Sequence, residues 1–289
     1  MRVSIEQFVP LAQLFRPILE SNQRACGDVD RDPWASLRFF LLGYAYEHQG
    51  RAADYPAAAE DTVIEFSGDL LNSNVADRFW KRFSARLAEA GRNGQQALNF
   101  ANNPLCPKGF KFRHRRKGSS YERATSKESV LEVLGSLGNR CITSRARDLI
   151  HNGEVLKAHT QLRRIGGIGP KIASLFLRDI STLYDLQPLP QDREYLQPVD
   201  IWIRRVVRNC AADNKFSDEK CRAYVITHCS DQPERANQGI WYFCARVASS
   251  SNYRVNECLQ DSRQWQRAVE RHLVDIENAA MAAANFVGR

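Results

Sequence analysis

The chain has 289 residues, 43% of them hydrophobic, which is enough to bury a sizeable core in one large domain or two closely packed ones. Lysine and arginine outnumber aspartate and glutamate by 41 to 33, and the resulting net charge of +8 favours a polyanionic partner such as nucleic acid. No apolar run reaches the roughly 18 residues of a membrane span, and the first twenty residues lack an export signal, so we expect no membrane partner and an intracellular location, cytoplasmic with the nucleoid or nuclear.

Helical periodicity dominates the chain, and no segment shows sustained alternation of apolar and polar residues. We therefore predict an all-α fold. Thr125 and Glu128 have the spacing of a capping box, which predicts a helix that ends near Leu137. The other expected helices cover residues 8–19, 34–46, 55–66, 75–90, 144–151, 154–163, 175–183, 199–208, 218–228, 238–248 and 262–284.

The longest expected loop covers residues 102–124 and is strongly basic. Its cationic residues are Lys108, Lys111, Arg113, His114, Arg115, Arg116, Lys117 and Arg123. Such a cluster is either a solvated loop or a surface that contacts nucleic-acid phosphates. On the second interpretation, Arg113, Arg115, Arg116 and Lys117 are candidate DNA-binding residues.

A glycine-rich turn interrupts the helical pattern in Arg164-Ile-Gly-Gly-Ile-Gly-Pro-Lys-Ile-Ala173. Gly167 and Gly169 allow a tight connection between two helices, and Pro170 suits the first turn of the second helix. A helix start of this kind presents backbone amides to an anion, so both glycines are candidate phosphate contacts. An ordinary helical hairpin with a glycine turn would have the same sequence pattern.

Lys171 and Asp200 are the candidate catalytic residues. Lys171 lies in the first turn of a predicted helix, where the positive end of the helix dipole disfavours the charged amine, and a neutral amine can form a Schiff base. A lysine that only contacts phosphate is equally compatible with this position. Asp200 precedes the apolar stripe of another helix, where it can cap the helix and also stabilise nearby positive charge.

Together, the hairpin sequence and the stretch Pro198-Val-Asp-Ile-Trp-Ile-Arg-Arg-Val206 resemble the helix-hairpin-helix DNA glycosylases, the superfamily of endonuclease III. The resemblance is strongest over residues 125–207. In that family a lysine at the position of Lys171 marks enzymes that also cleave the strand, and the aspartate at the position of Asp200 is essential. This chain departs from the common pattern at Gly166, where proline is usual, and at Trp202, where histidine is frequent.

The resemblance also implies a fold, a partner and a reaction. We expect two helical domains that flank a DNA-binding cleft, one formed by residues 1–50 with 187–289 and the other by residues 51–186. The second contains the hairpin at 164–173 and the basic loop at 102–124. The expected protein is a monomer that binds double-stranded DNA containing a damaged or modified base, excises that base through a Schiff base, and cleaves the strand as an AP lyase.

An earlier stretch, Leu41 to Arg51, resembles the family helix that ends in a DNA-facing glutamine, which makes Gln49 a candidate to fill the gap left by an extruded base. An exposed glutamine at a helix end fits the pattern equally. The long loop between Lys171 and Asp200 is similar to that of archaeal 8-oxoguanine glycosylases, a hint at the substrate.

Eight cysteines occur without a C-x-x-C pair, and Cys221, Cys229, Cys244 and Cys258 are too widely spaced for the iron–sulfur motif of several relatives. We therefore expect no metal and no cofactor, and buried structural thiols. Two other functions stay open: a noncatalytic helix-hairpin-helix DNA-binding protein, and a monofunctional glycosylase that uses water. An iron–sulfur DNA enzyme would be recognised by its absorption spectrum.

Overall fold

A computed structural model describes residues 3–46, 54–71, 73–91, 102–116, 119–138 and 141–287. The chain is mostly helical and divides into two compact units, each described by itself. We call them the terminal unit, formed by Met1–Ile18 and Val199–Arg289, and the central unit, formed by Leu19–Pro198. The predicted boundaries at residues 50 and 187 differ from these, because the helix that contains Trp34 packs in the core of the central unit.

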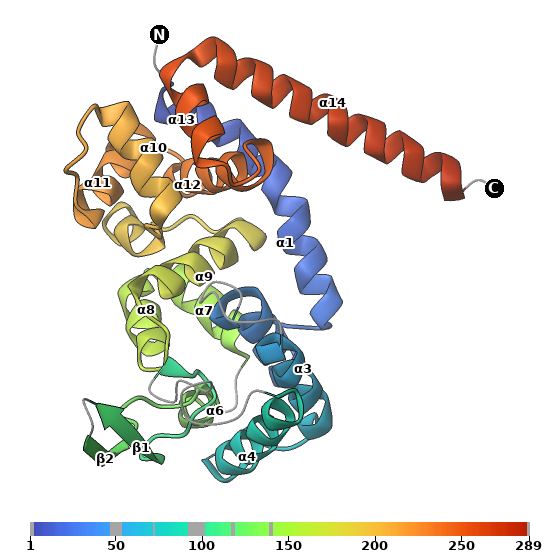
Figure 1. Ribbon diagram of the computed structural model, residues 1–289, viewed down its shortest axis with the longest axis vertical. Coiled ribbons are helices and arrows are strands. Elements are labelled where there is room, and N and C mark those ends of the chain that lie inside the picture. The colour runs from blue at the N-terminus through green and yellow to red at the C-terminus, as the bar shows by residue number, and fades with distance from the viewer. Residues whose placement is uncertain are drawn as a thin grey trace. The chain divides into compact units, whose positions relative to one another are not determined.

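The central unit contains helices and one small sheet (Figure 1). Its elements are α2 (Pro33–Phe40), the π-helix η2 (Leu41–Tyr46), α3 (Asp54–Phe66), α4 (Ser73–Glu89), β1 (Lys111–Arg116), β2 (Ser119–Ala124), α6 (Val130–Ser136), α7 (Ile142–His151), α8 (Val155–Arg163), α9 (Pro170–Leu183) and the 3-10 helix η5 (Pro190–Leu196). Helix α1 (Ala12–Cys26) begins in the terminal unit and ends in this one.

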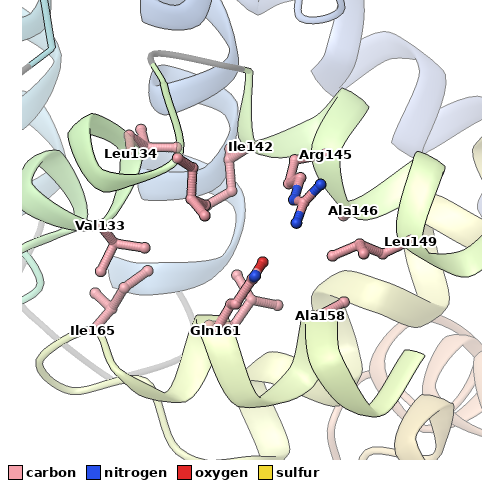
Figure 2. Close-up of a pocket in the computed structure, with 11 residues that line it drawn as sticks. Val133, Leu134, Ile142, Arg145, Ala146, Leu149, Ala158, Gln161 and Ile165 are labelled. Atoms are coloured by element: carbon pink, nitrogen blue, oxygen red, sulfur yellow. The ribbon is translucent and has the colours of Figure 1, made fainter. Parts of the chain in front are cut away.

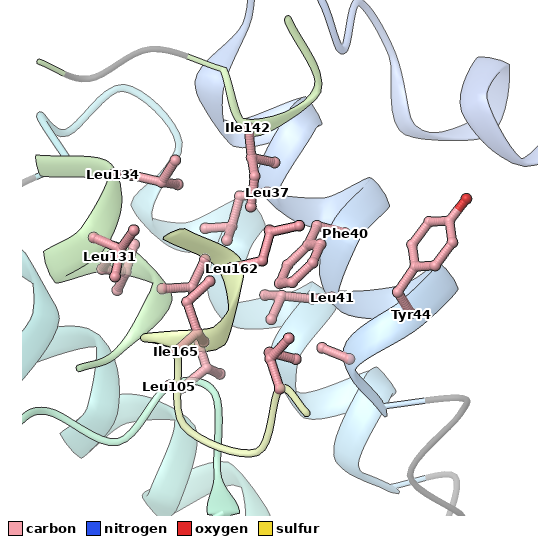
Figure 3. Packing of buried hydrophobic residues seen from close by; sticks show 14 of the residues in the cluster. Leu37, Phe40, Leu41, Tyr44, Leu105, Leu131, Leu134, Ile142, Leu162 and Ile165 are labelled. Carbon is pink, nitrogen blue, oxygen red and sulfur yellow. The ribbon is translucent and has the colours of Figure 1, made fainter. Parts of the chain in front are cut away.

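The core of the central unit is aromatic and aliphatic. Figure 3 shows Leu162 and Ile165 lying between the leucines of α6 on one side and Phe40 and Leu41 on the other. Trp34 stacks on Phe79 with ring centroids 6.0 Å apart and donates its indole N–H to the Asp69 carbonyl. Ile165 belongs to the connection between α8 and α9 and is fully buried, so its packing in the core holds that connection in place.

The segment predicted as a basic loop over residues 102–124 contains a β-hairpin, which corrects that expectation, while the mostly helical chain agrees with the expected all-α class. Strands β1 and β2 pair antiparallel, with Lys111 opposite Ala124 and Arg116 opposite Ser119. The strands carry almost no apolar residues, and their pairing therefore left no alternating hydrophobic signal. Phe112 is buried and attaches the hairpin to the core.

The predicted capping box is also displaced. Ser129, not Thr125, precedes α6, and its hydroxyl accepts the Glu132 amide while the Glu132 carboxylate accepts the Ser129 amide. The two boxes have the same spacing, so the sequence alone did not separate them. Thr125 instead donates its hydroxyl to the Pro107 carbonyl, and Glu128 is free for another interaction described below.

The terminal unit joins both ends of the described chain. Its elements are the 3-10 helix η1 (Ile5–Leu11), α10 (Ile201–Ala211), α11 (Asp218–His228), α12 (Pro233–Tyr242), the π-helix η6 (Phe243–Val247), α13 (Asn252–Gln260) and α14 (Ser262–Val287). Phe8 of η1 packs edge-on against Phe243 and Trp265, with centroids 5.5 and 5.7 Å away. Gly239 of α12 has no room for a side chain, because a Cβ there would overlap the Phe8 carbonyl.

None of the helices within the described ranges combines the length and the apolar character that crossing a membrane requires.

Candidate functional site

The turn between α8 and α9 is built from inward-facing isoleucines and outward-facing small residues. Ile165 and Ile168 are almost fully buried, whereas Gly167 adopts a φ of +75°, a conformation that disfavours any residue with a side chain. The Ile168 amide donates to the Ile165 carbonyl at 3.2 Å and closes the turn. The sequence prediction of a tight glycine connection between two helices is confirmed in this local form.

An ion pair clamps the turn to the segment before α6. The Arg164 guanidinium donates two hydrogen bonds to the Glu128 carboxylate, at 2.6 and 2.9 Å. These hydrogen bonds hold the pKa of Glu128 below its usual value. The backbones pair as well, since the Glu128 amide donates to the Arg164 carbonyl at 3.2 Å and the Gly166 amide donates to the Glu128 carbonyl at 2.9 Å.

Gly166, where the family that the sequence resembles usually has proline, packs against another segment of the chain. A Cβ at this position would lie 2.6 Å from the backbone carbonyl oxygen of Asn103, and that oxygen belongs to a buried residue. The Asn103 side chain accepts hydrogen bonds from Tyr46 and from the Leu105 amide, which fix it in place. A side chain of any size is therefore excluded at Gly166 unless the backbone moves.

Helix α9 begins with an open N-terminus. Gly169 is its N-cap residue, with φ −93° and ψ 178°, and has no side chain to accept the first amides. Pro170 occupies the first helical position, and Lys171 follows in the first turn, where it is half-buried. Space is free around Gly169, because a Cβ there would meet no atom within 4 Å. An amine thus lies next to helix amides that no side chain caps.

Helix α10, in the terminal unit, begins with a capped N-terminus. One oxygen of Asp200, Oδ1, accepts hydrogen bonds from the Trp202 and Ile203 amides, both at 2.9 Å. The prediction that Asp200 caps this helix is confirmed. Oδ2 accepts no hydrogen bond from the residues that the structure describes. Lys171 belongs to the central unit and Asp200 to the terminal unit.

The remaining candidate residues fall on or beside the less completely described parts of the chain. Arg113, Arg115 and Arg116 lie on β1, where the backbone pairing is defined and their side chains are outside the described part. Gln49 and Lys117 lie outside the described residues altogether. Their predicted contacts with DNA stay predictions.

The apolar cavity between α6, α7 and α8 is too small to hold a nucleobase. Its volume is about 20 Å³, room for a single water. Figure 2 shows aliphatic side chains such as Leu134 and Leu149 around it, with the polar ends of Arg145 and Gln161 pointing toward one another from α7 and α8. A base pocket is therefore not preformed in this part of the central unit.

Four of the five cysteines of the terminal unit are buried thiols, and the fifth, Cys210, is partly buried. Burial raises the pKa of Cys229 to about 12 and also raises the pKa values of Cys221, Cys244 and Cys258, so these thiols stay protonated near neutral pH. Across the described ranges, no group of three or more His, Cys, Asp or Glu side chains is arranged to hold a metal ion. The expectation of buried structural cysteines is confirmed for these four.

Sequence reasoning missed Glu128 and Arg164 as the clamp of the turn, because the glutamate had been assigned to a capping box. It also missed a group of arginines on α13 and α14 that line a groove of the terminal unit. The four-residue spacing of Arg267 and Arg271 in the last helix was the available signal.

No family model matches the chain, and no solved structure matches it. The chain is similar to an uncharacterised protein of Methanocaldococcus jannaschii, with 39% identity over 113 residues. That match covers 36% of this chain and 26% of the archaeal protein, so the chain spans about a quarter of the length of the curated relative that it matches.

Proposed function

We propose that the protein is a DNA glycosylase with associated AP-lyase activity, which excises a damaged or modified base. The observation that carries the proposal is the start of α9, where Lys171, a half-buried residue, follows an uncapped glycine turn. A phosphate can bind uncapped amides at a helix start, and an amine beside it is within reach of the same nucleotide. The net charge of +8 agrees with a polyanionic partner.

The turn serves as a backbone anchor in this proposal. Gly167 and Gly169 are the proposed phosphate contacts, a Cβ at Gly169 would meet no atom within 4 Å, and the Glu128–Arg164 clamp holds the turn rigid before DNA arrives. In this proposal α8, the turn and α9 form a helix-hairpin-helix motif. Strand β1 adds cationic residues whose contribution to binding falls with salt.

The reaction begins when the target nucleotide is flipped out of the duplex. The amine of Lys171 attacks C1′, and the glycosidic bond breaks with its electron pair going to the departing base, which takes up a proton. We assign Asp200 the roles of proton acceptor and of stabiliser of the positive charge that develops on the sugar. The C1′–O4′ bond then breaks to give the imine while O4′ takes up a proton, and loss of a C2′ proton expels the 3′ phosphate by β-elimination.

Borohydride trapping tests the proposal directly. Reduction of the imine during reaction with a panel of damaged duplexes should join protein and DNA covalently, giving one slower species on a denaturing gel. Lys171→Gln should abolish this species and strand cleavage. The matched control is Lys157→Gln on α8, an exposed lysine that pairs with Glu154 at 2.9 Å, and it should trap like the wild type.

The other outcomes identify the alternatives. Trapping that persists in Lys171→Gln would assign the chemistry to another amine. Base release without any trapping would make the enzyme monofunctional, with water as the nucleophile. Binding of duplex DNA without base release from any substrate would leave a noncatalytic helix-hairpin-helix protein and overturn the enzymatic proposal.

A further inference from the structure

The terminal unit contains a large polar groove that the proposed reaction does not use. The groove is formed by η6, α13 and α14 and has a volume of about 670 Å³. Its lining is mostly polar and includes four arginines, Arg246, Arg254, Arg267 and Arg271. All four are exposed, so their guanidinium groups are accessible to a ligand.

These arginines are not neutralised by the protein. Within the described residues none of the four makes an ion pair, although Glu257 and Asp275 also line the groove. Elsewhere in the same unit arginines do find carboxylates: Arg204 binds Asp218 at 2.6 Å and Arg222 binds Glu219 at 3.3 Å. The groove therefore keeps an excess of positive charge that these other sites lack.

The helix geometry concentrates this charge. Arg267 and Arg271 are one turn apart on α14, and the Arg271 Nε donates to the Arg267 carbonyl at 3.2 Å. Like charges at this spacing repel and destabilise a helix, and an anion bound between them would offset that repulsion. Each guanidinium can donate two parallel hydrogen bonds to a phosphate.

The lining favours phosphates over bases. The one aromatic ring among the lining residues is the imidazole of His272, and it is hydrogen-bonded to the Tyr242 hydroxyl at 3.0 Å. Pockets that hold a base or another small molecule are mostly apolar and aromatic, unlike this one. A row of guanidinium groups on successive turns of a helix matches the repeating phosphates of a nucleic-acid strand.

We propose that this arginine groove binds the phosphodiester backbone of duplex DNA without reading its sequence. The inference rests on the proposed DNA partner and adds a second contact surface, in the terminal unit, to the α8–α9 turn of the central unit. Sequence-independent contacts of this kind release counterions, so each bound phosphate steepens the salt dependence of the affinity by about 0.9 in a plot of log K against log salt.

Fluorescence anisotropy with an undamaged duplex tests the groove. The double variant Arg254→Gln/Arg267→Gln should bind about tenfold or more weakly at low salt, and its salt slope should be flatter by about 1.8, two contacts at 0.9 each. The control variant Lys215→Gln/Arg235→Gln removes the same charge from exposed positions of the same unit outside the groove. It should change the slope by much less.

Equal effects of the two variants would show a response to net charge alone and overturn the groove proposal, and so would an unchanged slope in the groove variant. Circular dichroism and thermal unfolding of both variants check that the fold is kept.

Base release at saturating protein separates the groove proposal from the glycosylase proposal. The groove variant should reach the wild-type rate there, because it keeps Lys171 and Asp200. If the wild type releases no base, the glycosylase proposal is refuted. The salt slopes of DNA binding still test the groove proposal in that case.

Discussion

The starts of α9 and α10 differ in what occupies their first amides. At α9 the cap residue is Gly169, which offers no side chain, while at α10 the Asp200 carboxylate accepts two amides at 2.9 Å. A capped start is stable by itself, and an open start has unused donors for an anion. A glycine cap makes the start of α9 less stable than a start with a side-chain cap, and this is the place where we propose that phosphate binds.

The largest expected effect is on base release and concerns the capped start. Asparagine caps a helix about as well as aspartate, so Asp200→Asn should keep the fold and DNA binding while removing the charge. Single-turnover base release should fall by about 10² to 10⁴, the range for a proton-transfer group. Asp218→Asn, which removes a carboxylate from the first turn of α11, is the control and should release base normally. Near-normal base release by Asp200→Asn would mean that Asp200 acts only as a helix cap.

The packing of the turn against Asn103 can be disturbed by a single methyl group. Gly166→Ala places a Cβ against the Asn103 carbonyl, and overpacking against a fixed backbone costs about 1–3 kcal/mol. Chemical denaturation should show this loss in the free energy of unfolding. Gly43→Ala, in the same unit and with no atom within 4 Å of the added Cβ, should be neutral or slightly stabilising. Equal stabilities for the two variants would mean that the turn moves freely.

The open start can be converted into a closed one. Gly169→Asp has room for its side chain and a backbone that suits an N-cap, so it should raise the free energy of unfolding by roughly a few tenths of a kcal/mol. The same carboxylate would occupy the amides and repel phosphate, and DNA affinity should fall although the protein becomes more stable. Gly169→Ser separates capping from charge. If Gly169→Asp binds DNA as well as the wild type, the turn is no phosphate site.

The smallest expected effect is a pH dependence from the Glu128–Arg164 pair. Hydrogen bonds from Arg164 lower the pKa of Glu128, so its contribution to stability is present at neutral pH and is lost as pH falls through the lowered pKa. Because the pair is partly exposed, the contribution should be less than about 1 kcal/mol. Denaturation at pH 7 and pH 3 should show a gap between wild type and Glu128→Gln that closes in acid. A gap that persists in acid would have another origin.

Local signals allowed both helix starts to be predicted from the sequence. Glycine and proline before Lys171, and an aspartate directly before the apolar stripe of α10, specify helix starts whatever the rest of the chain does. The clamp could not be predicted, because Glu128 and Arg164 meet only through a backbone pairing between distant segments. The β-hairpin was missed for a related reason. Its strands are mostly polar and show neither the apolar periodicity of a helix nor the apolar–polar alternation of a strand.

The same limit applies to the candidate site. The need for Gly166 depends on the Asn103 carbonyl, which the core brings to it from far away in the sequence. The arginine groove combines residues from three helices, and only those of α14 repeat at helical spacing. Sequence reasoning therefore found the chemical groups that act within one element and missed the surfaces that several elements build together.

The packing of Phe8 against Gly239 has a consequence for synthesis on the ribosome. Residues of the central unit are contiguous from Leu19 to Pro198, and they can fold as soon as they have emerged. The segment before them packs against α11 and α12, so Ile5 and Phe8 stay exposed until the last third of the chain is made. Chaperone binding to this nascent segment should be strongest during that interval.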